Sequence, residues 1–239
     1  RGSFTVLCGQ SGSGKTTLLR LLKRELAPHG TLGGEILYCN EPLADLDDRR
    51  STAEIGFVRQ DPDEQLVTDK VWHELAFGPE SLGMKTADIR RRVGEMASYF
   101  GIQSWYHNDT DRLSGGQKQL LNLAAVMVMQ PKLLLLDEPT SQLDPIAAAD
   151  FIATLQKLNR ELGITIIMVL HDINLAARYS DVLMAVKGGR LYAAGTPAEI
   201  VNKRYLQEIF EIEASVYTDP VHKCPYFIPL RTTIHEKKA

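Results

Sequence analysis

The pattern of hydrophobic residues changes its period several times along the chain. Residues 4–8 are an apolar and β-branched run, and leucines with helical spacing follow a glycine-rich turn at 9–14. Two more apolar runs, at 133–136 and 164–170, are separated by a helical stretch. Strands that are apolar throughout and alternate with helices are typical of a parallel sheet covered on both faces. We therefore predict an α/β fold.

Capping signals place the helices more closely. Asp144 precedes Pro145, and Gly163 ends the apolar periodicity, so a helix is predicted between them. A middle helix is predicted to be capped by Thr86, with Arg90-Arg91-Arg92 facing mostly away from its apolar side. That apolar side is predicted to comprise Ile89, Val93, Met96 and Phe100.

Two further signals lie toward the C-terminus. Lys187-Gly188-Gly189-Arg190 predicts a hairpin turn, and the capping box from Thr196 to Glu199 predicts the start of a helix.

Composition narrows the class of protein. The chain has 239 residues, which allows one large α/β domain or two small ones. Its net charge of −3 argues against a nucleic-acid-coating protein, and no apolar run is long enough to span a bilayer. The cysteines Cys8, Cys39 and Cys224 are widely spaced, so we expect them to be reduced, as in a cytosolic protein.

The first chemical motif is the segment between the predicted strand 4–8 and the helix that follows. It fits the pattern G-x-x-x-x-G-K-[ST], in which glycines let backbone N–H groups converge on phosphates. Lys15 is predicted to reach the β- and γ-phosphates, and the Thr16 hydroxyl to bind Mg²⁺. The nucleotide-binding residues predicted here are Gly9, Gln10, Ser11, Gly12, Ser13, Gly14, Lys15, Thr16 and Thr17.

The second motif is a pair of carboxylates directly after the four-leucine strand. Asp137 is predicted to hold the magnesium ion. Glu138 points elsewhere and is predicted to orient or deprotonate the attacking water.

Between these motifs lies Leu113-Ser114-Gly115-Gly116-Gln117, followed by an apolar helical stretch. The order of phosphate loop, LSGGQ, Asp137-Glu138, the segment Ser141 to Asp144, and a histidine after a strand resembles the ATP-binding-cassette (ABC) ATPases. The resemblance covers about residues 3 to 195 and implies a P-loop NTPase core, RecA-like and mainly parallel. It also implies a helical insertion that carries the LSGGQ signature.

The resemblance implies roles for several further residues of this chain. It implies a head-to-tail dimer in which Ser114, Gly115, Gly116 and Gln117 face the ATP bound by a partner cassette. It makes Gln60 the glutamine that senses Mg²⁺ and water, and His171 the histidine that contacts the γ-phosphate. The implied metal ligands are therefore Thr16, Gln60 and Asp137. The other histidines are expected to be structural or surface residues: His29, His73, His107, His222 and His235.

Two features depart from the family pattern. Gln142 occupies the position that is usually alanine in the S-A-L-D segment, a mild change with which activity should survive. The antiparallel strands that precede the phosphate loop and carry an adenine-stacking aromatic are largely absent from this chain. We therefore expect an exposed sheet edge and weakened nucleotide affinity.

The segment after Gln60 bears on the type of ABC protein. Residues 60–65 and 74–78 are similar to the Q-x-P-D-x-Q and E-x-A-F-G signatures of energy-coupling-factor ATPases, which power uptake of vitamins and of cobalt or nickel ions. Within what we take as one short loop, acidic residues mix with Trp72 and Phe77, which favours a specific groove for a membrane partner. Residues 171–179 and 212–220 instead resemble importers of iron–siderophore, haem or cobalamin, which remain the alternative.

Two other classes are disfavoured. ABC proteins of ribosomes or DNA usually have fused cassettes or long coiled-coil arms, and a regulator without hydrolysis would lack the base or a magnesium ligand. We therefore predict an ATPase on the cytoplasmic face of the cell membrane, partnered by a second cassette and a transmembrane coupling subunit, and not by nucleic acid. Residues 1–239 are predicted to form a single cassette domain. Its predicted parts are the core (1–71 and 131–195), the helical subdomain (72–130) and a C-terminal extension (196–239).

Overall fold

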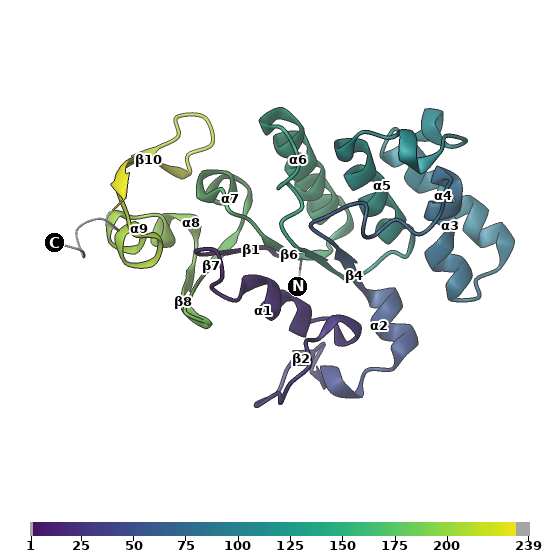
Figure 1. The fold of residues 1–239 in the computed structure, drawn as a ribbon, viewed down its shortest axis with the longest axis horizontal. Helices are drawn as coiled ribbons and strands as arrows, with labels where there is room; N and C mark the ends of the chain where they lie inside the picture. The colour runs from purple at the N-terminus through teal and green to yellow at the C-terminus, as the bar shows by residue number, and fades with distance from the viewer. Residues whose placement is uncertain (1, 233–239) are drawn as a thin grey trace. The chain divides into compact units, whose positions relative to one another are not determined.

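The computed structural model describes residues 2–232, which form two compact units (Figure 1). Unit 1 comprises Arg1–Leu19 and Ile152–Ala239, and unit 2 comprises Arg20–Phe151. The chain passes from one unit to the other within helices α1 (Lys15–Leu21) and α6 (Pro145–Leu162). His235 and the end of the expected extension 196–239 lie outside the described residues. The subdomain boundaries expected at 71, 130 and 195 stay predictions.

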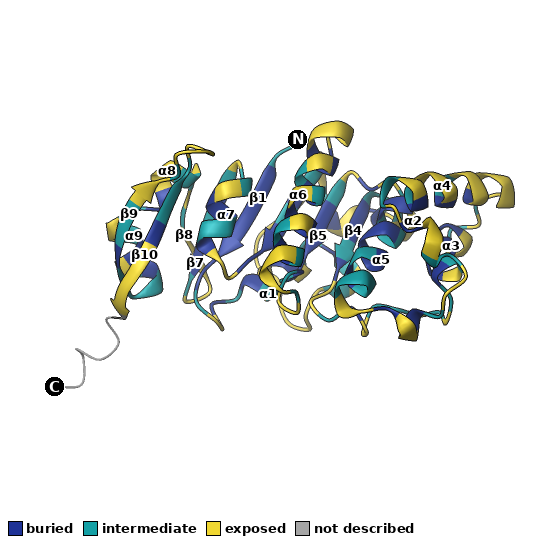
Figure 2. Ribbon diagram, turned by 90° about the horizontal axis from the view of Figure 1, so that it is seen from above, coloured by how far each residue is buried: buried dark blue, intermediate teal, exposed yellow. Residues whose placement is uncertain are grey.

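A mostly parallel group of strands organises unit 1. Strand β1 (Phe4–Cys8) pairs in parallel with β6 (Thr165–Val169) on one side and with β7 (Val182–Lys187) on the other. Strand β8 (Arg190–Gly195) is antiparallel to β7. Every residue of β1 is buried (Figure 2), as a strand covered on both faces requires. The predicted parallel α/β arrangement is confirmed within this unit.

The turn between β7 and β8 is the hairpin that the sequence predicts. Gly188 and Gly189 have φ angles of 55° and 73°, and Lys187 lies opposite Arg190. Two successive positive φ angles are what a tight hairpin with the right-handed strand twist needs, and glycine adopts them without steric cost.

A second hairpin in unit 1 was not predicted from the sequence. Strands β9 (Ile212–Thr218) and β10 (Pro225–Thr232) form a two-stranded antiparallel sheet. It is fixed to the helix after β6 by Asn174, whose side-chain amide donates to the Phe227 carbonyl and accepts from the Phe227 N–H. The remaining helices of unit 1 are α7 (Ile173–Tyr179), α8 (Pro197–Ile200) and α9 (Lys203–Phe210).

Unit 2 joins a pair of parallel strands to a group of helices. Strand β4 (Ile55–Val58) pairs with β5 (Leu133–Leu136), the predicted four-leucine strand. Helices α3 (Val71–Ser81), α4 (Thr86–Tyr99) and α5 (Gly115–Val128) pack around a shared apolar core, so the middle of the chain is helical as predicted. The shorter elements are α2 (Asp48–Glu54), strands β2 (Leu37–Tyr38) and β3 (Glu41–Pro42), and the 3₁₀ turns Arg24–Leu26, Leu43–Asp45, Gln103–Trp105 and Thr110–Arg112.

The ends of helices α6, α8 and α4 can be compared with the caps that the sequence predicts. The Asp144 carboxylate accepts from the N–H groups of Ile146 and Ala147, and Gly163 follows the end of α6 with a φ of 64°. Both predictions for α6 are confirmed, as is the capping box that opens α8. The prediction for Thr86 is wrong: Lys85 is the N-cap of α4 and Thr86 is already helical, because Lys85 holds the extended conformation that ends the preceding turn.

Candidate functional site

The phosphate-loop segment 9–16 follows β1 in unit 1 and has a backbone that only glycine adopts readily at three positions. Gly9, Gly12 and Gly14 have φ angles of 150°, 75° and 95°. A Cβ on Gly9 would lie 2.2 Å from the carbonyl oxygen of Val186, so no other residue fits there. Glycine is thus required by the conformation as well as by the motif.

Lys15 and Ser13 give this loop its polar character. The Lys15 ammonium is buried and donates to the carbonyl oxygens of Gly9 and Gln10, each at 2.9 Å. The Ser13 hydroxyl is also buried, and none of the described residues forms a hydrogen bond with it. Buried polar groups are usually partnered, so a positive side chain beside an unsatisfied hydroxyl is consistent with a loop that holds an anion. Thr16 and Thr17 follow in the first turn of α1.

His171 lies at the same edge of unit 1 as the phosphate loop. Strands β1 and β6 are parallel, with Leu7 opposite Val169, so Gly9 and His171 each come two residues after a paired position. Asp172 then caps α7, accepting from the Leu175 N–H at 2.9 Å. The carboxyl ends of parallel strands meet at one edge of a sheet, which is where ligands of such folds bind.

The same geometry brings Gln60 and Glu138 together in unit 2. Val58 of β4 lies opposite Leu136 of β5, and each is followed two residues later by one member of the pair. The Gln60 side-chain amide donates to Glu138 Oε2 at 3.1 Å, across 78 residues of sequence. The structure therefore places the predicted sensing glutamine in contact with the predicted base.

Asp137 and Glu138 occupy different environments although they are neighbours. Asp137 is buried, its N–H donates to the Val58 carbonyl, and its carboxylate lies 3.8 Å from the Arg20 guanidinium. Glu138 has a φ of 47°, a left-handed conformation that costs a non-glycine residue about 1–3 kcal/mol. This turn separates the two carboxylates. Arg20 was missed by the sequence reasoning, because nothing in its spacing marks it as a partner of Asp137.

The signature segment opens helix α5 in unit 2. Ser114 is the N-cap and forms a capping box with Gln117: the Gln117 N–H donates to Ser114 Oγ at 3.3 Å, and the Ser114 N–H donates to Gln117 Oε1 at 2.9 Å. The Gln117 side chain therefore has a structural role here. The Ser114 hydroxyl accepts in this bond and keeps its own proton to donate. A Cβ on Gly115 would meet no atom within 4 Å, whereas a Cβ on Gly116 would lie 3.6 Å from Cδ2 of Leu143.

The predicted site residues thus divide between the two units. Unit 1 holds the phosphate loop and His171, whereas unit 2 holds Gln60, Asp137, Glu138 and the signature segment. The assignment of all these residues to a nucleotide site stays a prediction.

The donor chemistry fits a magnesium ion. Thr16 and Asp137 offer a hydroxyl and a carboxylate, which are oxygen ligands, and Mg²⁺ is commonly bound by one or two carboxylates together with substrate phosphates and water. Between residues 2 and 232 there is no group of three or more His, Cys, Asp and Glu side chains able to cage a metal. Phosphate oxygens would therefore have to complete the coordination.

The segment after Gln60 is not the single short loop that the sequence suggested. Trp72 and Phe77 lie on helix α3, which begins at Val71 directly after the loop. Trp72 packs partly against the helical core, whereas Phe77 is 44% exposed. At the start of α3 the N–H groups of Val71 and Trp72 donate to the carbonyl oxygens of Asn108 and Tyr106.

Glu74, the first residue of the E-x-A-F-G segment, lies on α3 and holds the loop in front of it, a contact that the sequence did not predict. Its buried carboxylate accepts from the N–H groups of Val67 and Thr68 and from the Thr68 hydroxyl, at 2.8 to 3.1 Å. A carboxylate that accepts three hydrogen bonds is tightly fixed. Glu74 therefore shapes the surface that Phe77 exposes.

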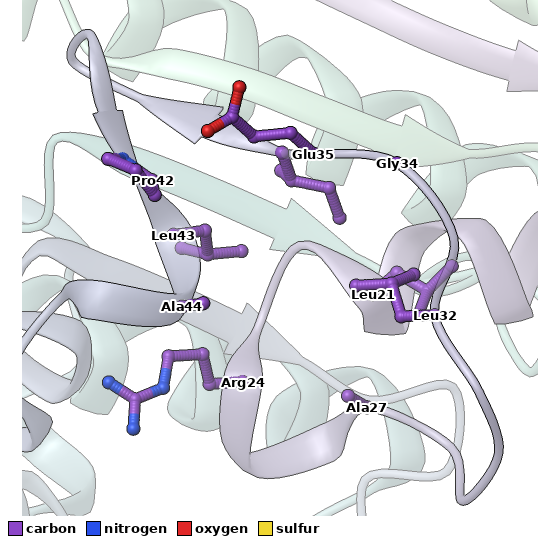
Figure 3. Close-up of a pocket in the computed structure, with 10 residues that line it drawn as sticks. Leu21, Arg24, Ala27, Leu32, Gly34, Glu35, Pro42, Leu43 and Ala44 are labelled. Atoms are coloured by element: carbon purple, nitrogen blue, oxygen red, sulfur yellow. The ribbon is translucent and has the colours of Figure 1, made fainter.

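A cavity of about 500 Å³ lies elsewhere in unit 2 (Figure 3). Its lining is mainly apolar, as with Leu21, Leu32 and Leu43, and includes Arg24 and Glu35. None of the predicted site residues lines it.

Within residues 2–232, no helix combines the length and the apolar character needed to cross a bilayer.

Comparisons with known proteins show the family to which this chain belongs. The ABC transporter family model matches residues 1–141. An energy-coupling factor transporter ATP-binding protein, EcfA2 of Clostridium perfringens, is 37% identical over 84% of this chain and 70% of its own length. The chain therefore belongs to the ABC transporter ATP-binding family, and its relatives include members of the energy-coupling-factor type.

Two further matches extend this result. The structure of cbiO1 from Clostridium perfringens, described as part of the ABC transporter complex cbiONQ, has a TM-score of 0.77 and 36% identity, covering 86% of this chain and 82% of that chain. A putative ABC transporter ATP-binding protein of Bacillus cereus is 46% identical over 89% of this chain, but this match spans only 38% of that relative's length. The fold is thus that of a P-loop ABC ATPase, as predicted, while the chain corresponds to well under half of that relative.

The reactivity of Cys8, the residue just before the phosphate loop, tests the packing of β1. Burial, opposed in part by the charge of Lys15, raises the pKa of Cys8 to about 12. The thiolate is the reactive form, so Cys8 should stay unlabelled by a thiol reagent at pH 8 while the exposed Cys39 is modified. Peptide mass spectrometry before and after denaturation measures this. Rapid labelling of Cys8 in a folded Cys39→Ser variant would contradict the packing of β1.

Proposed function

We propose that this chain binds and hydrolyses ATP as the energy-providing part of a membrane importer of the energy-coupling-factor type. The observation that carries the proposal is the hydrogen bond from Gln60 to Glu138, which pairs an orienting amide with a carboxylate suited to act as a base. Membership of the ABC transporter family supports the same reaction, ATP and water giving ADP and phosphate.

In this proposal the phosphate loop binds the nucleotide through charge and backbone donors. The Lys15 ammonium, now on the carbonyl oxygens of Gly9 and Gln10, is shared with the β- and γ-phosphates when ATP is present. Thr16 and Asp137 hold the Mg²⁺ that neutralises charge on those phosphates. The glycines with positive φ let backbone N–H groups turn toward the phosphates.

The hydrolytic step is assigned to residues at the ends of the strands. Glu138 accepts a proton from the attacking water, and Gln60 orients that water through its side-chain amide. His171 contacts the γ-phosphate from the end of β6. Phosphoryl transfer depends mainly on positioning and charge stabilisation, which is what these fixed side chains supply.

A second cassette completes each site in the proposed dimer. The N-terminus of α5, with the Ser114 hydroxyl and the Gly116 N–H, is suited to donate to a γ-phosphate bound by the partner cassette. ATP then holds the two cassettes together, and its hydrolysis releases them. Gln142 lies in the segment expected at the dimer interface.

The membrane partner is proposed from the surface around the segment that follows Gln60. Phe77 is exposed on α3, and acidic residues of the preceding loop lie nearby in sequence, so this surface suits a coupling subunit that docks from the cytoplasmic face of the membrane. The energy-coupling-factor relatives support this type of partner. The proposed transported class, vitamins or cobalt and nickel ions, rests on the sequence resemblance alone.

A metal-chelate importer is the second candidate, and one observation favours it. The two segments that resemble such importers, 171–179 and 212–220, are joined by the ion pair of Arg178 with Asp219 at 3.4 Å, and Asn174 also bonds the backbone of Phe227, which follows the second segment. These segments therefore form one structural feature of this chain.

The proposed base can be tested by a single neutralisation. Glu138→Gln should still bind ATP, accumulate as the ATP-bound dimer and lose turnover by about a hundredfold or more, since the proton acceptor is gone. Steady-state phosphate release and size-exclusion chromatography with ATP measure these effects. The matched control Glu95→Gln removes an exposed carboxylate of α4 and should turn over normally. Unchanged turnover in Glu138→Gln would exclude Glu138 as the base.

The type of importer is decided by the partners of the full-length protein. Affinity capture from detergent-solubilised native membranes, followed by mass spectrometry, should recover a coupling protein and a small substrate-binding membrane protein. Recovery of a large permease with an external binding protein would instead support the metal-chelate candidate. Ribosomal or DNA-repair partners without a membrane protein would contradict both.

A further inference from the structure

Helix α5 contacts the segment that carries Gln60 through a row of polar side chains. The Gln119 amide donates to the Arg59 carbonyl at 3.2 Å, and the Asn122 amide donates to the Pro62 carbonyl at 2.9 Å. Gln119 and Asn122 are 2% and 1% exposed. One of these two bonds therefore lies on each side of Gln60.

The bonds hold the backbone of the segment rather than its side chains. Gln65 adds to the same restraint from within the loop, accepting from the Arg59 N–H at 2.8 Å and donating to the Phe57 carbonyl at 3.2 Å. Held at these points, the backbone around Gln60 has little freedom to move its side chain relative to Glu138.

Strand β4, which leads into this segment, is also packed closely against α5 (Figure 1). A Cβ on Gly56 would lie 2.4 Å from Cγ1 of Val126, so the strand backbone approaches the helix without room for a side chain. The strand and the helix therefore form one rigid pair, and the loop after the strand is bonded to the helix as well.

The two buried amides are costly if they serve packing alone. Gln119 Oε1 and Asn122 Oδ1 are buried, and neither accepts a hydrogen bond within the described part of the chain. An apolar side chain of similar volume would avoid that desolvation penalty. Their donor groups thus point to a role that packing does not fill.

We propose that Gln119 and Asn122 are positioning residues that fix the Arg59–Pro62 backbone so that Gln60 meets Glu138. Both lie on the helix that begins at Ser114, so they also join the signature segment to the loop of the predicted sensing glutamine. This inference rests on the proposed ATPase function. It assigns a part in the catalytic step to two buried residues of α5 that are not among the predicted site residues.

The test uses Asn122→Leu in the full-length protein with its partner cassette. Leucine keeps a similar volume and removes the donor together with its unsatisfied oxygen. Positioning predicts that kcat falls about tenfold to a hundredfold, while KM for ATP stays within about twofold, because only the orientation in the catalytic step is lost. Gln119→Met should behave in the same way and serves as the second variant.

A double-mutant cycle with Gln60→Ala separates positioning from a structural effect. If Asn122 acts through Gln60, Asn122→Leu should lower kcat no further in the Gln60→Ala background. The matched control is Asn159→Leu, because Asn159 is a buried asparagine of unit 1 that donates to the carbonyl oxygens of Gly2 and Ile164. It should lower the melting temperature and leave kcat unchanged.

The outcomes distinguish this inference from the function on which it rests. An unchanged kcat in Asn122→Leu and Gln119→Met, or losses that multiply with that of Gln60→Ala, would overturn the positioning role while leaving the ATPase proposal in place. If Gln60→Ala itself hydrolyses ATP at the normal rate, the catalytic role of Gln60 fails, and the positioning role fails with it.

Discussion

The parallel pairing of β4 with β5 is the constraint on which the candidate site depends. It places Val58 opposite Leu136, so the residues that follow the two strands leave the sheet at one edge. The hydrogen bond from Gln60 to Glu138 is the direct result. In unit 1 the pairing of β1 with β6 does the same for the phosphate loop and His171. Each unit therefore concentrates its polar residues where parallel strands end.

Burial then gives neighbouring groups different properties. Asp137 is enclosed beside an arginine, whereas Glu138, one residue later, turns into a left-handed conformation and meets the Gln60 amide. The roles proposed for them, metal ligand and general base, need such different surroundings, and a single backbone turn provides them. The phosphate loop likewise combines two features in a short segment. Its glycines allow the backbone to approach β7, and the Lys15 ammonium donates to a carbonyl oxygen of the loop.

Local signals were enough to predict much of this architecture. The apolar runs of β1 and β5, the Asp144 cap, the two-glycine turn at 188–189 and the capping box at Thr196 all depend on residues close in sequence. The β9–β10 hairpin could not be predicted in this way, because Asn174 fixes it from a distant helix. Helix α3 lies within the predicted helical subdomain, but its first turns were taken for part of a loop, and backbone bonds to Tyr106 and Asn108, distant in sequence, hold its start.

The candidate site also contains residues that local motifs predicted and residues whose roles depend on contacts distant in sequence. Motifs identified Lys15, Glu138 and Ser114 without reference to the structure. Arg20 beside Asp137 has no motif, and the motif that contains Glu74 does not show that its carboxylate holds the preceding loop, since both contacts arise only when separate segments fold together. Asn122 belongs to this group, because a buried asparagine within an apolar helix is informative only once its partner carbonyl is known.

The central claim is that ATP is held between two cassettes and hydrolysed beside Gln60 and Glu138. The most direct measurement is an experimental structure of the full-length protein with its partner cassette, Mg²⁺ and a non-hydrolysable ATP analogue. The account predicts phosphates on the Lys15 loop, Ser114 of the partner cassette at the γ-phosphate, and Glu138 facing the position of the attacking water. A nucleotide bound away from Glu138, or without contact to the signature segment of a second cassette, would contradict it.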